Sequence, residues 1–135
     1  MDVPDGFEPF PDQGPFLEYV GPIHVREGDG EGAPVLGVRA EERHANHRST
    51  VQGGLLSTLA DFALGRAIGH DAPDDHGRAT VSLTVDYLKP AKPGDWIESR
   101  TSVDRVGGTL AFADCTLTVG DDDIARARAV FVVVD

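Results

Sequence analysis

One segment of the chain, residues 53–69, carries apolar side chains at the spacing of an α-helix. Its apolar residues recur at intervals of three and four positions, which places them on one broad helical face. They are Leu55, Leu56, Leu59, Ala60, Phe62, Ala63, Ala67 and Ile68. Gly69 and the polar run HDAPDDHG then end the pattern. A face this wide predicts a helix that is buried on most sides.

Alternation of apolar and polar residues predicts strands on both sides of this helix. Two strands are expected before it and four after it. Their expected ranges are 16–28, 34–43, 80–88, 95–106, 109–119 and 124–134. Gly107-Gly108 separates two of them and predicts a tight hairpin there.

The order of these elements predicts an α+β fold in which six mainly antiparallel strands wrap around one long central helix. Short βαβ units are missing from the pattern, so a doubly wound parallel sheet is not expected. The length of 135 residues suits one domain. Residues 1–15, rich in Pro, Asp and Gly, are expected to form an N-terminal arm, and residues 16–135 the domain itself.

The formal net charge of −11 argues against nucleic acids and anionic membranes as partners. Asp outnumbers Glu by 16 to 7 and Lys occurs twice. This composition fits either a very soluble acidic protein or a protein of a high-salt cytoplasm. No apolar run reaches membrane-spanning length, and the N-terminus does not have the pattern of a signal peptide. We therefore expect a cytoplasmic protein without a membrane partner.

The expected start of the helix, at Gly53-Gly54, is the first candidate for chemistry. A helix N-terminus exposes backbone N–H groups that have no partner inside the helix, and glycine lets a substrate oxygen approach them. This is the physics of an oxyanion hole for acyl transfer. Alternatively, the glycines only let the helix pack tightly against a strand.

Asp61 is the second candidate, because it is a lone carboxylate within the apolar helix. A carboxylate among apolar side chains needs a reason, although Asp61 also suits a solvent-exposed polar face. It follows Gly54 by seven residues, or two turns, so both lie on one side of the helix. The axial offset is about 10 Å at about 1.5 Å per residue, which is too far for one carbonyl to touch both. A site shared by two subunits follows, and we expect a homodimer or a homotetramer.

Three ordered motifs resemble the PaaI-like acyl-CoA thioesterases, including the branch of thioesterase superfamily member 2. The first runs from Asn46 through Gly53-Gly54 to Leu59-Ala60-Asp61. The others are YLKPA at residues 87–91, followed by Gly94-Asp95, and GTLAF at residues 108–112. The resemblance spans about residues 16–134 and implies the hotdog fold.

The resemblance assigns roles to particular residues. Asp61 matches the family's general base or nucleophile, and Gly53 the N–H that polarises the thioester carbonyl. Asn46 matches the loop amide that helps to place the substrate or the attacking water. Thr80 matches a Ser or Thr that contacts this water. Gln52 stands where the family usually has His, and it keeps a hydrogen-bonding role but not proton transfer near neutral pH.

Substrate binding is expected at the helix start, at Gly54, and around the two lysines. Lys89 and Lys92 lie on either side of Pro90 and form a local positive spot in an acidic chain, suited to the phosphates of coenzyme A. Arg48 is a further candidate for this spot. The alternative is a solvated loop with two ordinary lysines.

These observations predict hydrolysis of an acyl- or aryl-CoA thioester to a free acid and CoA. No cofactor is expected beyond the CoA of the substrate. A metal site is not expected either, because no third ligand accompanies His44 and His47 at suitable spacing. A hotdog hydratase would need a His at the helix start, whereas a non-catalytic acyl-CoA binding protein stays open as the alternative.

Overall fold

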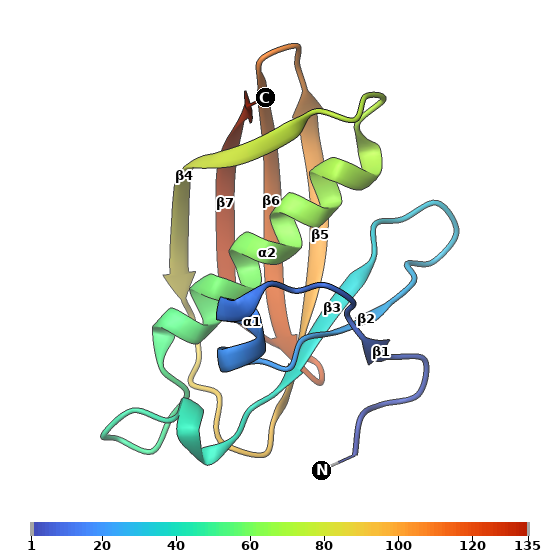
Figure 1. The fold of residues 1–135 in the computed structure, drawn as a ribbon. Helices are drawn as coiled ribbons and strands as arrows, with labels where there is room; N and C mark the ends of the chain where they lie inside the picture. The colour runs from blue at the N-terminus through green and yellow to red at the C-terminus, as the bar shows by residue number, and fades with distance from the viewer. Residues whose placement is uncertain (1, 135) are drawn as a thin grey trace.

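The computed structural model describes residues 2–134 as one antiparallel sheet with a long helix, α2, lying across one face (Figure 1). The helices are α1 (Pro15–Val20), the 3₁₀ turn η1 (Glu42–His44) and α2 (Gly53–Asp71). The strands are β1 (Glu8–Pro9), β2 (His24–Arg26), β3 (Val35–Arg39), β4 (Gly77–Tyr87), β5 (Trp96–Val106), β6 (Leu110–Val119) and β7 (Asp122–Val134).

The sheet has the strand order β1-β2-β3-β5-β6-β7-β4, and every neighbouring pair is antiparallel. The strand that follows α2 in the chain, β4, therefore forms one edge of the sheet, next to the last strand, β7. The other edge is β1 from the N-terminal arm. This topology places both ends of β4 beside α2, and it brings the start of the helix next to the end of β4.

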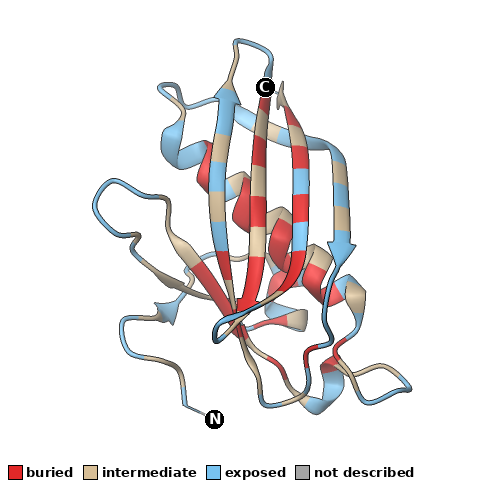
Figure 2. Ribbon diagram, turned by 180° about the vertical axis from the view of Figure 1, so that it is seen from behind, coloured by how far each residue is buried: buried red, intermediate tan, exposed pale blue. Residues whose placement is uncertain are grey.

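The core lies between α2 and the concave face of the sheet. Alternate residues of β7, Ala125, Ala127 and Ala129, are buried toward the helix, while Arg126 and Arg128 between them are exposed. Figure 2 shows this alternation of buried and exposed positions along the central strands. Small side chains on β7 leave room for the large residues of α2, of which Leu59, Leu64 and Ile68 are fully buried. The helix is therefore buried on most sides, as its wide apolar face predicted.

The structure corrects the first expected strand, residues 16–28. Residues 15–20 form α1, and only His24–Arg26 form a strand, β2. Pro15 at the first turn fixes a helical φ, and Leu17 is buried while its neighbours are exposed. The weak alternation of this segment thus belongs to a short amphipathic turn rather than to a strand.

Two further details differ from the expectation. The second strand ends at Arg39 instead of residue 43, and Glu42–His44 form a 3₁₀ turn closed by a reciprocal capping box between Glu41 and His44. The sheet has seven strands rather than six, because the two-residue strand Glu8–Pro9 of the arm pairs with β2. Residues 8 and 9 show no periodicity in the sequence, since a two-residue strand is too short to show one.

The α+β arrangement of one central helix and an antiparallel sheet is confirmed, as is the hairpin at Gly107-Gly108. Strands β5 and β6 pair from Glu98↔Thr118 to Val106↔Ala111, and residues 107–109 connect them. Among residues 2–134, no helix is long and apolar enough to cross a membrane.

Candidate active site

Asp61 lies in the middle of α2, on the side of the helix that faces β4. Its carboxylate oxygen Oδ1 accepts a hydrogen bond of 2.7 Å from the Thr80 hydroxyl of β4. Asp61 is half-buried, and its neighbours Leu59, Ala60 and Ala63 are fully buried. The structure therefore brings together two of the residues expected in the site, one from the helix and one from the edge strand.

The position of Thr80 depends on an irregularity in β4. The register between β4 and β7 shifts between Thr80 and Ser82, so that Thr80 is opposite Phe131 and Ser82 is opposite Val130. A bulge of this kind re-aims the side chains next to it. Thr80 turns its hydroxyl toward α2, where it holds one oxygen of the Asp61 carboxylate and fixes its orientation.

The start of α2 presents its two glycines differently. Gly53 is covered by the Tyr87 ring, and a Cβ on Gly53 would come within 3.0 Å of Tyr87 Cζ. Gly54 is exposed, and a Cβ there would meet only Gln52 Cγ, at 3.9 Å. A side chain at position 53 would need the Tyr87 ring to move by a few tenths of an ångström, so glycine suits this close packing, which was the alternative interpretation of the sequence. Independently of this packing, the N–H groups of the first turn have no acceptors inside the helix, and that of Leu55 donates to the Gln52 carbonyl at 3.0 Å.

Tyr87, at the end of β4, is a site residue that the sequence analysis did not assign. Its hydroxyl donates to the Gly53 carbonyl at 3.2 Å and forms a 2.6 Å hydrogen bond with the Ser57 hydroxyl. These contacts fasten the first turn of α2 to the edge strand. The signal available in the sequence was an aromatic residue with a polar hydroxyl near the end of an alternating strand, as the first residue of the YLKPA motif.

The loop before α2 holds Asn46, whose side chain organises the loop itself. The amide oxygen of Asn46 accepts from the backbone N–H of Arg48 at 2.8 Å and of Thr50 at 3.3 Å, and the amide nitrogen donates to the Thr50 hydroxyl at 3.0 Å. Arg48 is exposed on this loop. Within one chain, neither residue lines the cavities beside the helix start.

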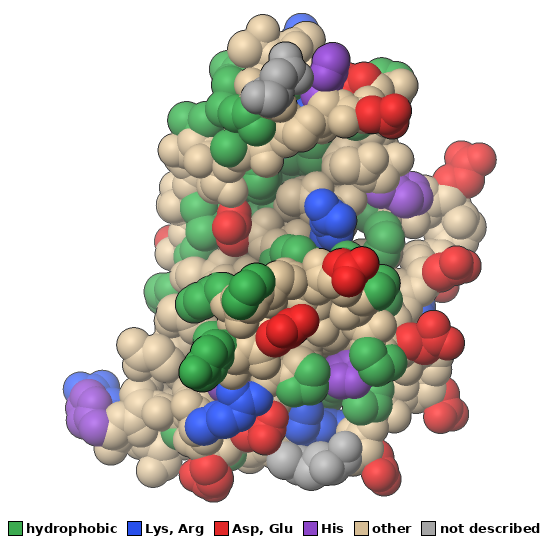
Figure 3. Space-filling view, viewed as in Figure 1, with side chains coloured by type: hydrophobic (Ala, Val, Ile, Leu, Met, Phe, Trp, Pro, Cys, Tyr) green, Lys and Arg blue, Asp and Glu red, His purple; other side chains and the backbone are tan. Residues whose placement is uncertain are grey.

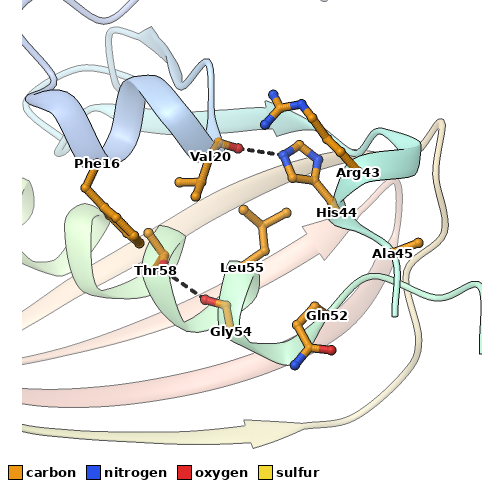
Figure 4. A pocket seen from close by; sticks show the side chains of 9 residues that line it. All are labelled: Phe16, Val20, Arg43, His44, Ala45, Gln52, Gly54, Leu55 and Thr58. Carbon is orange, nitrogen blue, oxygen red and sulfur yellow. Dashed lines mark hydrogen bonds between the residues drawn. The ribbon is translucent and has the colours of Figure 1, made fainter. Parts of the chain in front are cut away.

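Two cavities flank the first turn of α2. The larger, of about 520 Å³, lies between α1 and α2 and is shown in Figure 4. Its lining includes Gln52 and Gly54. The second, of about 350 Å³, lies on the other side of the helix start. Its lining includes Gly53, Tyr87, Lys89 and Pro90. The helix start is therefore reached from two sides by space that a ligand can occupy.

The two lysines have different surroundings. Lys89 lines the second cavity, and its ammonium group forms a 3.1 Å ion pair with Asp122. Lys92 is exposed, and among residues 2–134 its ammonium group has no ion-pair partner. The expected positive spot is thus partly neutralised at Lys89. Pro90 lies beside Lys89 in the same cavity wall.

His44 holds neighbouring segments together through its hydrogen bonds, whereas Gln52 makes no capping contact at the helix start. His44 is buried, accepts the backbone N–H of Glu41 at its Nδ1 atom, and bonds the Val20 carbonyl through Nε2 at 2.5 Å. His44 therefore pins α1 rather than acting as a metal ligand, and no group of three metal-ligating side chains occurs within the described residues. Gln52 precedes the helix without capping it through its side chain.

The distance along α2 keeps Asp61 apart from the helix start of its own chain. Seven residues at about 1.5 Å rise separate it axially from Gly54 by about 10 Å. The tyrosine clamp on Gly53 and the threonine contact of Asp61 are both on the β4 side. Within one chain, Asp61 and the helix start therefore lie on the same side of α2, but they are too far apart to contact one reacting carbonyl together.

Comparison with known proteins places the chain in a family. The model of the thioesterase superfamily matches residues 49–125, which include α2 and the strands up to the start of β7. The Pseudomonas aeruginosa protein PA0474, provisionally named as an esterase, is 40% identical over 131 residues, or 97% of each chain. Acyl-coenzyme A thioesterase 13 of Mus musculus is 35% identical over 81 residues, 60% of this chain and 57% of its own length.

Solved structures agree with this assignment. The zebrafish thioesterase superfamily member 2 superposes with a TM-score of 0.80 at 28% identity, over 91% of this chain and 89% of the other. The Escherichia coli PaaI protein superposes with a TM-score of 0.81 over 92% of this chain and 87% of its own, and at 18% identity it shows the shared fold alone. The chain therefore belongs to the thioesterase superfamily and has the hotdog fold that its PaaI-like motifs predicted.

Proposed function

We propose that the protein hydrolyses acyl- or aryl-CoA thioesters to a free acid and CoA, with Asp61 as its catalytic carboxylate. The observation that carries this proposal is the 2.7 Å hydrogen bond from Thr80 to Asp61, on the helix whose first turn offers backbone N–H donors. Membership in the thioesterase superfamily supports the reaction class. The name of the mouse relative supports CoA thioesters as the substrates.

In the proposed reaction, Asp61 takes one of two roles. As a general base it removes a proton from a water molecule while the water oxygen attacks the thioester carbon. As a nucleophile its own oxygen attacks, the CoA thiolate leaves, and water then hydrolyses the mixed anhydride. The bond from Thr80 occupies Oδ1, which leaves Oδ2 for either role. In both routes the Gly53 N–H stabilises the oxyanion, and the thiolate leaves as CoA after taking up a proton.

The proposed working unit is a homodimer, or a tetramer made of dimers, in which Asp61 of one subunit meets the helix start of its partner. The axial offset of about 10 Å within one chain supports this arrangement. The edge strand β4 carries Val81 and Tyr87 with 60% and 55% exposure, and Leu88, the residue after it, is 47% exposed. Hydrophobic side chains reach the surface along this edge (Figure 3). An exposed apolar edge is a surface that a second copy can cover.

The proposed CoA path runs through the cavity that contains Gly53, Lys89 and Pro90. Lys92, which has no ion-pair partner among the described residues, is placed to add a phosphate contact, and Arg48 is proposed for the same role. The amide of Asn46, bound within its own loop, is proposed to set the loop that leads into the helix start. A cytoplasmic location remains our expectation from the sequence.

The alternative function is non-catalytic binding of acyl-CoA, which the replacement of the family's usual His by Gln52 motivates. Turnover separates the two functions. Asp61→Asn should lower kcat by at least about 100-fold, the usual scale of a base or nucleophile, without loss of fold. Asp71→Asn makes the same change at the exposed end of α2 and should keep kcat within about twofold. Near wild-type kcat for Asp61→Asn would remove Asp61 from the reaction.

A colorimetric assay of released thiol suits this test, because the single cysteine of the protein is hidden. Burial of Cys115 raises the pKa of its thiol to about 12, so it stays protonated and out of reach of the reagent at assay pH. The signal therefore reports CoA rather than protein. If a panel of acyl- and aryl-CoA thioesters releases no thiol while calorimetry detects their binding, the binding function replaces the hydrolase.

A further inference from the structure

The cavity between α1 and the first turns of α2 has mainly apolar walls that come from two segments far apart in the chain. Figure 4 shows Phe16 and Val20 reaching down from α1 toward Leu55 and Thr58 of α2. Its volume of about 520 Å³ lies within the range of pockets that hold small organic ligands. Gly54 and Gln52, at the helix start, belong to the same wall, so the cavity opens at the first turn of α2.

The polar side chains of this cavity are already engaged, with one exception. Arg43 donates to the carbonyls of Tyr19, at 2.7 Å, and Gly21, and it pairs with Glu41 at 3.1 Å. His44 is bonded at both ring nitrogens. The Thr58 hydroxyl donates to the Gly54 carbonyl at 2.8 Å.

The exception is Gln52, whose side-chain amide has no hydrogen-bond partner within residues 2–134. It is exposed beside the helix start, where a thioester group would enter. The cavity therefore offers apolar contact along its walls and a single uncommitted amide at its mouth. It offers no uncommitted charge to a ligand.

Helix α1 forms one wall of the cavity, and its buried Leu17 anchors it to the core. Its last carbonyls are held by Arg43 and His44 from the segment before α2. Phe16 remains 64% exposed on the cavity side, although it is a large apolar residue. An exposed phenyl ring at the rim of an apolar cavity gains burial when an apolar ligand enters.

We propose that this cavity receives the acyl part of the thioester, and that Phe16 and Val20 of α1 set which acyl groups are accepted. The proposal rests on the proposed function, since the carbonyl would lie at the helix start with its acyl group on the α1 side and its CoA part on the Lys89 side. The substrate class that fits is an uncharged, apolar acyl group of medium length or with one aromatic ring. Acyl groups that end in a carboxylate do not fit, because the one cation of the cavity, Arg43, is already paired.

A series of acyl-CoA substrates of increasing acyl length gives a quantitative expectation. Each methylene buried in an apolar site changes the free energy of binding enough for an about fourfold change in affinity. The ratio kcat/KM should therefore rise about fourfold per added methylene from acetyl-CoA upward, until the cavity is filled. Butanoyl-CoA should exceed succinyl-CoA by more than about tenfold, since burying an unpaired carboxylate costs more than one methylene gains.

Two substitutions in α1 test the assignment from opposite directions. Phe16→Ala removes the rim ring and should lower kcat/KM for the longest accepted acyl group by about tenfold, while acetyl-CoA changes less than about twofold. Val20→Phe fills the cavity without altering the backbone carbonyl that His44 holds, and it should move the preferred acyl length down. Tyr19→Ala is the matched control, since its side chain is 83% exposed on the same helix and does not line the cavity.

Calorimetry on the Asp61→Asn protein measures the affinity of each acyl-CoA of this length series relative to free CoA. This readout does not need turnover, so it separates the two proposals. If the wild-type protein hydrolyses none of these thioesters while the size-dependent affinities persist, the proposed reaction is overturned and the acyl cavity is kept. Acyl-length profiles for Phe16→Ala and Val20→Phe that coincide with that of Tyr19→Ala, in both readouts, would overturn the cavity assignment.

Discussion

The two edges of the sheet differ in length and chemistry. Strand β1 has two residues, one charged and one proline, and both features prevent further pairing. Strand β4 has eleven residues, and three large apolar side chains on it or directly after it, those of Val81, Tyr87 and Leu88, are about half exposed. Proteins usually shield a long edge, so the contrast supports β4 as the edge that the proposed partner subunit covers. The Asp61–Thr80 pair and the Tyr87 clamp both lie on this second side.

The largest effect should come from placing the same charge on each edge. Val81→Lys should shift the protein toward monomers in sedimentation and lower turnover at dilute protein by at least about tenfold, because a two-fold interface contains each substituted residue twice. Glu8→Lys on β1 is the matched control and should change neither quantity. Full activity of a monomeric Val81→Lys protein would show that the edges do not differ in function.

A smaller effect is expected where β4 touches the catalytic carboxylate. Thr80→Val removes the hydroxyl that orients Asp61 and should lower kcat by about tenfold, the scale of one hydrogen bond to a charged group. Thr84→Val, exposed on the same strand, tests the cost of the substitution itself and should be neutral. If both variants behave alike, the contact is structural and the proposed role of Thr80 fails.

The loop that follows β4 should affect binding rather than chemistry. Replacing Lys89 and Lys92 together by Ala should raise KM for CoA thioesters several-fold and leave kcat nearly unchanged, as loss of uniform binding does. A short thioester without the nucleotide should show no such change. Arg26→Ala, on the β1 side, removes a comparable surface charge and serves as control. Equal KM values for the double variant and the wild type would exclude this loop from the CoA path.

The smallest expected effect is a change in the shape of a pH profile. Gln52→His introduces a side chain with an unperturbed pKa of about 6.5 at the mouth of the acyl cavity. The pH profile of kcat/KM from pH 5 to 9 should gain an inflection near neutrality if position 52 touches the substrate or the attacking water. Profiles that superimpose would remove Gln52 from the site.

The long, strongly periodic elements could be predicted from the sequence, whereas the short ones could not. Helix α2 and strands β4 to β7 have enough residues for their periods to be read, and the seven-residue spacing of Gly54 and Asp61 indicated that both lie on one side of the helix. Helix α1 has six residues and β1 has two, so neither shows a period. The contacts of Asn46, Tyr87 and His44 join segments that are distant in the chain or turn back within a loop, and sequence spacing does not encode such contacts.

The salt response of the whole protein is a separate consequence of its charge of −11. If the acidic surface suits a high-salt interior, the melting temperature should rise with KCl toward molar concentration, as screening reduces repulsion among the carboxylates. A melting temperature that stays flat or falls would leave only the simpler interpretation of an acidic surface.

The central claim is that each active site combines Asp61 of one subunit with the helix start of the other, and complementation of two inactive variants tests it most directly. Asp61→Asn lacks the carboxylate, and Asn46→Ala disturbs the loop that leads into Gly53. After co-refolding in equal amounts, half of the dimers are hybrids with one intact site, so activity should return to about one quarter of the wild-type value. If each site lies within a single chain, no hybrid has an intact site, and a mixture as inactive as its components would contradict the account.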